Sequence, residues 1–318
     1  MASADFVIDD PDADTRLLLE RVAAANLPPI ETLTPQEARD QFRQRAKAAA
    51  FPPDEVGAVE DMVLPLSGHR LAARLYHPAP DHRPRPLVVY FHGGGMVIGD
   101  LETHDTICRR ICAQAGAIVA AVEYRKAPEF PFPHAADDAI AAFRFFSREW
   151  DDPRSDRDRI FVAGDSAGGT LAAVVAQHCA TAAPGLLRGQ ILIYPALDHV
   201  NPTPSRNRLT DQFPIGRTAL EWYERQYFTD PQQAHSVLAS PALAEDLTGV
   251  APALIVTAGL DPLRDEAERY AERLGRIAQP TKHVHFPGTI HGFLGMGAIL
   301  SVAQDAVNEI AAYIGPGS

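Results

Sequence analysis

Cysteine is scarce in this sequence, with three residues among 318. So low a count does not suggest a chain held together by disulfides, as many small secreted domains are. Cys108 and Cys112 lie four residues apart in an expected helix. Because no histidine or cysteine completes a ligand set around them, helix packing explains this spacing better than a metal site. We therefore expect neither a metal ion nor an organic cofactor.

Long apolar runs and an excess of basic residues are also absent. No stretch approaches the roughly 18 apolar residues that cross a bilayer, and residues 1–14 lack the basic and apolar regions of a signal peptide. The formal net charge is −12, which disfavours binding to nucleic acid or to an anionic membrane surface. These absences predict a cytoplasmic protein with no nucleic-acid partner and no stable membrane insertion.

The residues that are present suit a globular protein. Hydrophobic residues make up 46% and charged residues 22%, and the length fits one large α/β domain with an accessory piece. Short apolar segments, which we expect to be strands, alternate with segments of helical length. The expected strands cover residues 58–64, 70–77, 87–91, 117–124, 160–163, 190–194, 253–257 and 282–286, and the expected helices between them cover residues 104–115, 134–150, 166–180, 263–277 and 299–314.

This alternation predicts an α/β fold with about eight strands in a mostly parallel sheet, flanked by helices. The first two strands flank a turn and add an antiparallel hairpin at one edge. The main domain would comprise residues 54–198 and 236–318. Residues 1–53, with two expected helices, and residues 199–235 stand outside the alternation. We expect both to form a helical cap over the carboxyl ends of the strands, where ligands bind in open α/β sheets; a surface insertion without contact to the site is the alternative.

A serine lies at a sharp turn between an expected strand and an expected helix. Residues 164–169 read Gly-Asp-Ser-Ala-Gly-Gly. In a turn of this kind the central residue, Ser166, is exposed at the tip, and glycine on either side avoids collisions with the strand and the helix. The pattern predicts a nucleophile, although small-residue turns also follow strands in proteins without this chemistry.

A serine hydroxyl is a weak nucleophile and needs a base within hydrogen-bond reach, normally histidine. His291 follows the last expected strand, in a loop that reads Pro-Gly-Thr-Ile-His-Gly from residue 287. A loop after the carboxyl end of a strand can place a side chain over the serine, so His291 is the predicted base. His283 and His285 alternate along the strand itself, so they share a face of the sheet, and we expect a structural role for them and not a catalytic one.

The third member of such a triad is an acid that orients the histidine. Asp261 follows the expected strand at residues 253–257, and the order serine, acid, histidine agrees with α/β-hydrolases. Asp198 follows the preceding strand and is the alternative. Asp265 and Glu266 lie inside the next helix, where we expect them to cap the helix or to face solvent.

An oxyanion-binding loop is the fourth part that this chemistry requires. Residues 92–95 read His-Gly-Gly-Gly directly after an expected strand, a pattern typical of lipases and esterases. We expect the backbone N–H groups of Gly93, Gly94 and Ala167 to hold the oxyanion. A flexible turn or a phosphate loop is the alternative, but a phosphate loop ends in lysine and serine or threonine, whereas residues 96–98 read Met-Val-Ile.

Together these motifs resemble those of the hormone-sensitive-lipase-like esterases of the α/β-hydrolase fold. The resemblance implies hydrolysis of carboxylic esters by Ser166, His291 and Asp261, a helical cap, and pairing into a homodimer through the last strand. The sequence departs from the family at Met96, where an aromatic residue is usual, and at Lys126, where an aliphatic one is. The matching residues are 92–95, 124–125, 127–129, 131–133, 164–169, 261–266 and 291–293.

The predicted function is that of a serine carboxylesterase acting on short- to medium-chain acyl esters. Since the base must be neutral to accept a proton, activity should fall below about pH 6, where an ordinary imidazole becomes charged. Two alternatives remain at this point. The same fold hosts receptors that bind small ligands without catalysis, and the same triad serves amides, lactones or carbamates.

Overall fold

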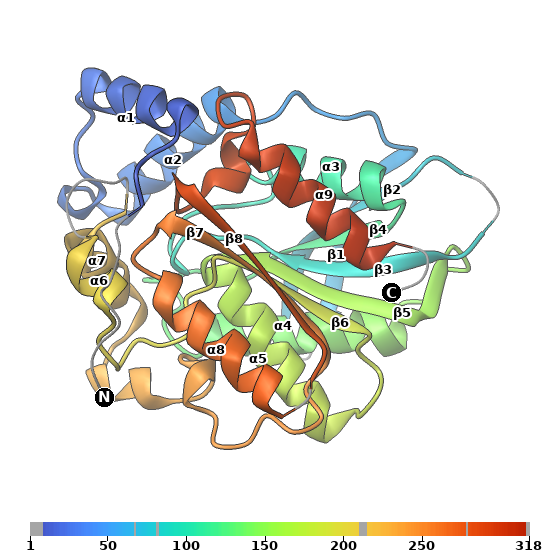
Figure 1. Cartoon of the computed structure of the whole chain (residues 1–318). Coiled ribbons are helices and arrows are strands. Elements are labelled where there is room, and N and C mark those ends of the chain that lie inside the picture. Colours follow the sequence, from blue (N-terminus) through green and yellow to red (C-terminus); the bar gives the residue numbers. More distant parts are fainter. Residues whose placement is uncertain (1–8, 67, 81–82, 210–214, 278, 316–318) are drawn as a thin grey trace.

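The computed structural model describes residues 9–66, 68–80, 83–209, 215–277 and 279–315. Its centre is an eight-stranded sheet with the order β1-β2-β4-β3-β5-β6-β7-β8 (Figure 1). Strand β1 pairs antiparallel with β2, and β2 pairs antiparallel with β4, while β4, β3 and β5 to β8 are parallel to one another. The strands are β1 Ala58–Leu66, β2 His69–His77, β3 Arg85–Phe91, β4 Ile118–Glu123, β5 Ser155–Asp165, β6 Gly189–Ile193, β7 Ala253–Leu260 and β8 Thr281–Ile290.

The parallel strands other than β8 lie inside the sheet, where apolar sequences are covered on both faces. Every residue of β6 and of β7 is buried, as expected for strands covered by helices on two sides. The expected α/β-hydrolase sheet is thus confirmed. It is longer than predicted at β8, which continues through Pro287 to Ile290 where a loop was expected. Proline is tolerated there because β8 is the last strand in the order and needs hydrogen bonds along one side.

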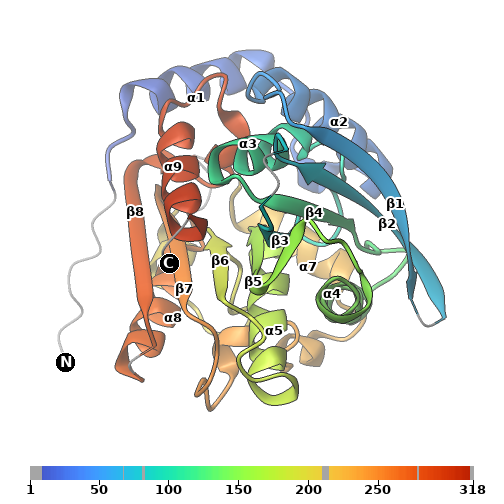
Figure 2. The ribbon, with the colours of Figure 1, turned by 90° about the vertical axis from the view of Figure 1, so that its right-hand side faces the viewer.

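Helices cover both faces of the sheet in two layers (Figure 2). One core lies beneath α3 and α9, and the other beneath α4, α5 and α8. Helix α4 ends before the predicted residue 150, and a wider π-helical turn, Phe145–Glu149, follows it with its phenylalanines packed edge to face. The helices of the two layers are α3 Asp105–Ala115, α4 His134–Arg144, α5 Ala167–Ala182, α8 Arg264–Arg276 and α9 Val302–Ile314.

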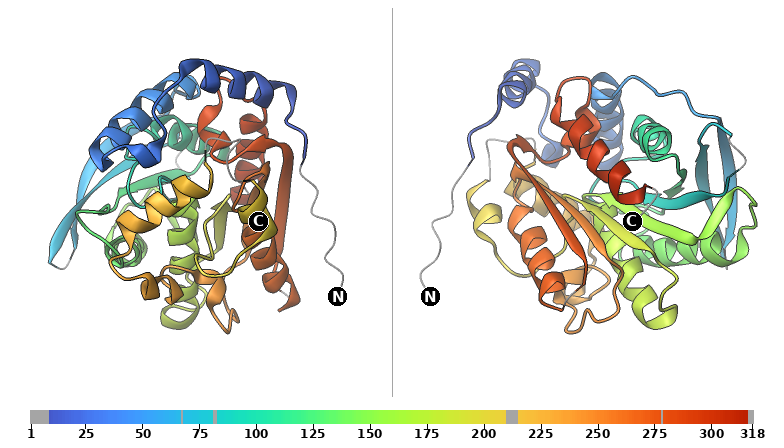
Figure 3. Two further views of the ribbon diagram at one scale, coloured as in Figure 1. Left: turned by 90° about the vertical axis from the view of Figure 1, so that its left-hand side faces the viewer. Right: turned by 45° about the vertical axis from the view of Figure 1, so that its right-hand side comes forward.

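The remaining helices gather at the carboxyl ends of the strands (Figure 3). They are α1 Ala13–Ala25, α2 Pro35–Ala49, α6 Pro204–Arg208 and α7 Arg217–Tyr227. Helix α7 belongs to residues 199–235, the segment after β6 that interrupts the alternation of strands and helices. Its Thr218 hydroxyl donates to Glu31 Oε1 at 2.8 Å, which connects this segment to residues 1–53. Residues 1–8 and 210–214, which fall within the predicted cap ranges, lie outside the described residues.

Short 3-10 helices complete the described backbone, at Ile30–Thr32, Pro231–His235, Pro241–Leu243 and Phe293–Met296. Within the described ranges, no helix has both the length and the apolar character needed to cross a bilayer.

Candidate active site

The turn between β5 and α5 brings Ser166 to the tip of a tight elbow. Ser166 has φ 54° and ψ −121°, a backbone conformation that side chains rarely adopt. The neighbouring glycines allow the turn to be this close. A Cβ on Gly164 would lie 2.2 Å from the Gly168 carbonyl oxygen, and a Cβ on Gly168 would lie 1.9 Å from the Phe91 carbonyl oxygen. The predicted strand–turn–helix context of Ser166 is therefore present.

Three side chains meet at this elbow in one chain of hydrogen bonds. His291 Nε2 lies 2.9 Å from Ser166 Oγ, and His291 Nδ1 lies 2.8 Å from Asp261 Oδ2. Because a carboxylate only accepts hydrogen bonds, Asp261 selects the tautomer with the proton on Nδ1, which leaves the lone pair of Nε2 for the Ser166 hydroxyl. The three residues follow β5, β7 and β8, so parallel strands deliver them to one edge.

Asp261 and His291 are also held from their other sides. The Asp261 side chain is 1% exposed, and its second oxygen, Oδ1, accepts the backbone N–H of Leu263 at 2.8 Å. The ring of His291 packs against Tyr194, with centroids 4.8 Å apart. Both side chains are therefore held in position beside Ser166 without having to reorient.

The glycine loop differs from the prediction in one respect. The Gly93 N–H, which was expected to bind an oxyanion, instead donates to Asp165 Oδ1 at 3.0 Å in this structure. Among the residues that the structure describes, the N–H groups of Gly94, Gly95 and Ala167 have no such acceptor. The amide of Ala167 is free because the first N–H groups of a helix have no intrahelical partner.

Comparison with known proteins identifies relatives along nearly the whole chain. Residues 88–295 match the family model of the α/β-hydrolase fold. An ethyl acetate hydrolase from Pseudomonas putida is 36% identical over 90% of this chain and 91% of its own length. Esterase LipI of Mycobacterium tuberculosis is 35% identical over 97% of each chain. The chain belongs to the hormone-sensitive-lipase-like esterases.

Solved structures of other esterases have the same fold as this one. An ester hydrolase from the metagenome of Lake Arreo matches with a TM-score of 0.92 and 37% identity, over 96% of this chain and 98% of that chain. The hyperthermophilic esterase of the archaeon Pyrobaculum calidifontis matches with a TM-score of 0.90 and 39% identity, over the same shares. The protein is a carboxylic-ester hydrolase of the serine type, and the receptor alternative is set aside.

Asp198, the alternative acid of this esterase, has a different set of partners. Its Oδ1 accepts the backbone N–H groups of Val200 and Asn201, each at 2.9 Å, and its Oδ2 accepts the Asn201 side-chain amide at 2.8 Å. These bonds close the turn that leads out of the sheet towards α6. The structure therefore brings Asp261, and not Asp198, to His291.

A buried ion pair supports the elbow of the esterase from below. Asp165 turns its carboxylate inward, where it accepts the Tyr90 hydroxyl at 2.8 Å and lies 3.3 Å from His104 Nε2. Burial works to raise the pKa of Asp165, but the charge of His104 and the hydrogen bonds outweigh it and lower that pKa. The same pairing raises the pKa of His104 against its own burial. The backbone of the glycine loop is anchored to this pair through Gly93.

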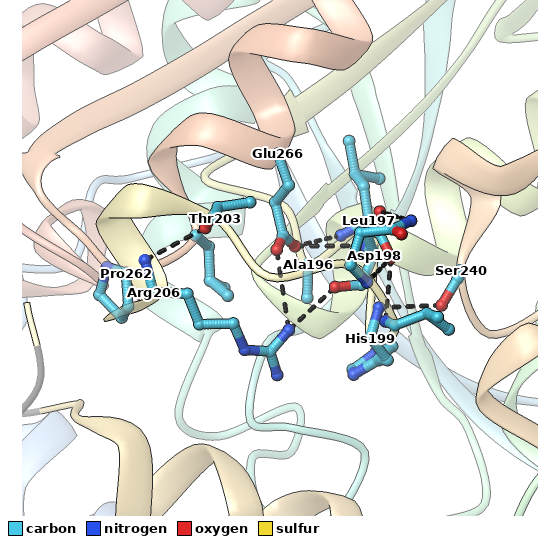
Figure 4. Close-up of polar contacts among 12 residues, drawn as sticks. Ala196, Leu197, Asp198, His199, Thr203, Arg206, Ser240, Pro262 and Glu266 are labelled. Atoms are coloured by element: carbon cyan, nitrogen blue, oxygen red, sulfur yellow. Dashed lines mark hydrogen bonds and ion pairs between the residues drawn. The ribbon is translucent and has the colours of Figure 1, made fainter. Parts of the chain in front are cut away.

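Glu266 was expected to cap its helix or to face solvent, and this prediction is wrong. Its side chain is buried, and Oε1 accepts the backbone N–H groups of Leu197 at 2.7 Å and Asp198 at 3.3 Å (Figure 4). Oε2 has no hydrogen-bond partner among the described residues, and the nearest cation, Arg206 Nη1, is 3.9 Å away. Burial raises the pKa of Glu266 to about 8. Glu266, which is 2% exposed, thus connects the start of α8, the helix that follows Asp261, to the residues at which the excursion after β6 begins.

Proposed function

We propose that this esterase hydrolyses short- to medium-chain acyl esters through an acyl-enzyme on Ser166. The observation that carries the proposal is the hydrogen-bond chain from Ser166 Oγ through His291 to Asp261, with distances of 2.9 and 2.8 Å. In this proposal Asp261 keeps the imidazole oriented and stabilises the imidazolium that forms during each proton transfer.

The reaction would proceed in two halves. His291 Nε2 takes the proton of Ser166 as Oγ attacks the ester carbonyl carbon, and the carbonyl oxygen becomes an oxyanion. The N–H groups of Gly94, Gly95 and Ala167 are the proposed donors to that oxyanion, and losing one such donor typically costs about 3 kcal/mol of transition-state stabilisation. His291 then gives its proton to the leaving alkoxide, and a water activated by the same nitrogen releases the acid.

The proposed limit on chain length rests on what surrounds the glycine loop. A Cβ on Gly95 would lie 2.3 Å from the ring of Tyr223, so a bulky side chain of α7 packs directly on this loop. We propose that residues 1–53 and 199–235 act as the cap, around a catalytic domain of residues 54–198 and 236–318. The relative that is 36% identical is named for ethyl acetate, a short ester, which agrees with a small acyl group.

The first experiment locates the nucleophile. The protein is treated with an organophosphate ester, and the adduct is mapped by mass spectrometry. A single adduct on Ser166, with loss of activity in proportion to labelling, supports the proposal. An active enzyme that is labelled elsewhere, or that stays active when fully labelled on Ser166, overturns it. An acyl panel then tests the chain length, since a clear preference for p-nitrophenyl palmitate over butyrate contradicts the proposed limit.

The choice of acid is tested with a matched pair of variants. Asp261→Asn should lower kcat by about 10⁴-fold, because an amide stabilises the wrong tautomer of His291. Asp198→Asn should leave kcat within about threefold, because the amide oxygen can still accept the N–H groups of Val200 and Asn201. Equal losses in the two variants would contradict the assignment of Asp261.

We also propose that the protein is a cytoplasmic homodimer. Strand β8 is the last strand in the order of the sheet and offers an edge for pairing with a second copy. The three cysteines are buried free thiols, which suits a reducing compartment. Light scattering after gel filtration tests the dimer, and a monomeric mass at about 100 µM protein, roughly the upper limit for a weak dimer, contradicts it. Cell fractionation tests the location.

A further inference from the structure

Two histidines on β8 face helix α8, on a part of the sheet that the reaction above does not use. His283 and His285 alternate along the strand, so both rings project from the same face. Helix α8 crosses that face and places Glu268 beside them. A cleft between α8 and β8 gives these side chains access to solvent. The cleft is lined by Glu268, Ala271, Glu272, Gly275, Thr281 and His283.

The nitrogen atoms of the two rings converge on one point. His283 Nε2 lies 2.8 Å and His285 Nδ1 lies 2.9 Å from the hydroxyl oxygen of Thr257, on the neighbouring strand β7. A hydroxyl has one proton, so it donates to one ring and accepts from the other. At least one of these two ring nitrogens therefore carries a lone pair, which accepts the Thr257 hydroxyl here and is available to a metal ion once that hydrogen bond is exchanged. Glu268 Oε1 lies 3.8 Å from His285 Nδ1, on the side towards α8.

The surrounding charges also suit a cation. Asp9 Oδ2 lies 3.6 Å from His285 Nε2, the nitrogen that points away from the cluster. Histidines that bind metals commonly have a carboxylate on this outer nitrogen, which orients the ring. The opposing charge is Arg264, whose Nε lies 3.9 Å from Glu268 Oε1 and whose Nη1 lies 3.6 Å from Asp9.

We propose that His283, His285 and Glu268 bind one Zn²⁺ ion between β8 and α8. Two imidazoles and one carboxylate form a ligand set that Zn²⁺ accepts, with water in the fourth position. The candidate ligand atoms lie within 4.8 Å of one another. Bonds of about 2.1 Å in a tetrahedron place ligand atoms about 3.4 Å apart, so these side chains must close by roughly 1.4 Å at most. The Glu268 side chain is 36% exposed and that of His285 is 31% exposed, so both have room to move.

An ion in this position joins two elements that also carry residues of the active site. Helix α8 begins three residues after Asp261, and β8 ends one residue before His291. The ion lies on the covered face of the sheet and does not contact the reacting atoms. The proposal is thus a structural site, and it does not depend on the proposed reaction.

Zinc binding is tested by calorimetry on the full chain after dialysis against EDTA. The expected result is one Zn²⁺ per chain, with Mg²⁺ and Ca²⁺ giving no heat because they prefer oxygen ligands. His283→Ala and Glu268→Gln should each weaken binding at least about tenfold. His178→Ala is the matched control, because this exposed histidine lies on α5, away from the cluster, and its loss should change nothing.

A second readout keeps the test independent of any single variant. Zn²⁺ at about 100 times the measured Kd should raise the midpoint of thermal unfolding in the wild type and in His178→Ala, but not in His283→Ala, since only the folded site binds the ion. Wild-type affinity in both His283→Ala and Glu268→Gln would overturn the proposal. So would the absence of binding up to about 1 mM Zn²⁺.

Discussion

Glu266 is a carboxylic acid held by two backbone amides, with its second oxygen left without a hydrogen bond. Its pKa of about 8 means that the folded protein keeps the proton at neutral pH. In the unfolded chain the same group titrates near its usual value of 4.5. The stability contributed by this group is therefore complete below pH 4.5 and declines as the pH rises towards 8.

Glu266→Gln should remove this dependence on pH. Glutamine has the same shape, and its carbonyl oxygen can accept the N–H groups of Leu197 and Asp198 without ever ionising. Relative to the wild type, the variant should gain stability on the order of 3 kcal/mol between pH 5 and pH 9. Denaturant unfolding at several pH values measures this difference.

The control for this change is Glu272→Gln on the same helix. Its side chain is 65% exposed, so the difference in stability from the wild type should hardly vary with pH. A constant difference between Glu266→Gln and the wild type from pH 5 to pH 9 would show that the buried carboxyl does not carry the raised pKa.

The active site divides into residues that the sequence could predict and residues that it could not. Ser166 and His291 follow strands whose apolar runs locate their carboxyl ends, and parallel pairing brings such ends together. The direction of the Gly93 N–H depends on local backbone angles and on the position of the Asp165 carboxylate. A run of glycines in the sequence predicts neither of them. Glu266 looks like an ordinary helix residue until its neighbour, the loop at Leu197, is placed.

At the scale of elements, the side chain of Arg39 connects helix α2 to two loops that follow strands of the sheet. The helix begins with a capping box in which Thr34 and Glu37 satisfy each other's backbone N–H groups. From its buried side, Arg39 donates to the carbonyl oxygens of Val97 and Ala127, each at 2.9 Å. These carbonyls belong to the loops that follow β3 and β4, so α2 and the glycine loop are held together.

Arg39→Ala should therefore lower the free energy of unfolding by about 2 kcal/mol, because it leaves two carbonyls without their charged donor. Arg43→Ala, one turn further along α2, should cost about 0.5 kcal/mol. The Arg43 side chain is 49% exposed and its main partner is Asp100, a surface type of ion pair. Urea unfolding of the two variants measures both changes, and equal losses would contradict the role assigned to Arg39.

The existence of a strand was more predictable than its ends. Strand β7 was recognised from its continuous apolar residues but was expected to end at residue 257, and it continues to Leu260. Strand β8 was cut short at Phe286 because Pro287 normally ends a strand. The pairing continues because Gly259 of β7 lets the backbone of Pro287 come close, as a Cβ on Gly259 would lie 1.9 Å from the Pro287 carbonyl oxygen. No pattern in the sequence around either residue predicts this contact.

At the scale of the whole molecule, the layers were predictable from the alternating pattern, whereas the cap was predicted only because two segments stand outside that pattern. Alternating strands and helices specify a sheet covered on two sides, and the structure has α3 and α9 on one face and α4, α5 and α8 on the other. The segments before β1 and after β6 carry no periodic pattern that says where they rest. Their placement depends on single contacts, such as the hydrogen bond from Thr218 to Glu31.

The division of the triad among β5, β7 and β8 has a consequence for how the protein acquires activity. Ser166 and His291 are separated by 125 residues of sequence, and they meet only after the intervening parallel strands have paired. Loop closure over such distances makes parallel sheets slow to form. On dilution from denaturant, far-UV circular dichroism should recover before ester hydrolysis does, and simultaneous recovery would contradict this order. Ester hydrolysis then reports only molecules in which all the strands have paired. The far-UV circular dichroism signal also includes molecules that have formed helices but not yet the complete sheet.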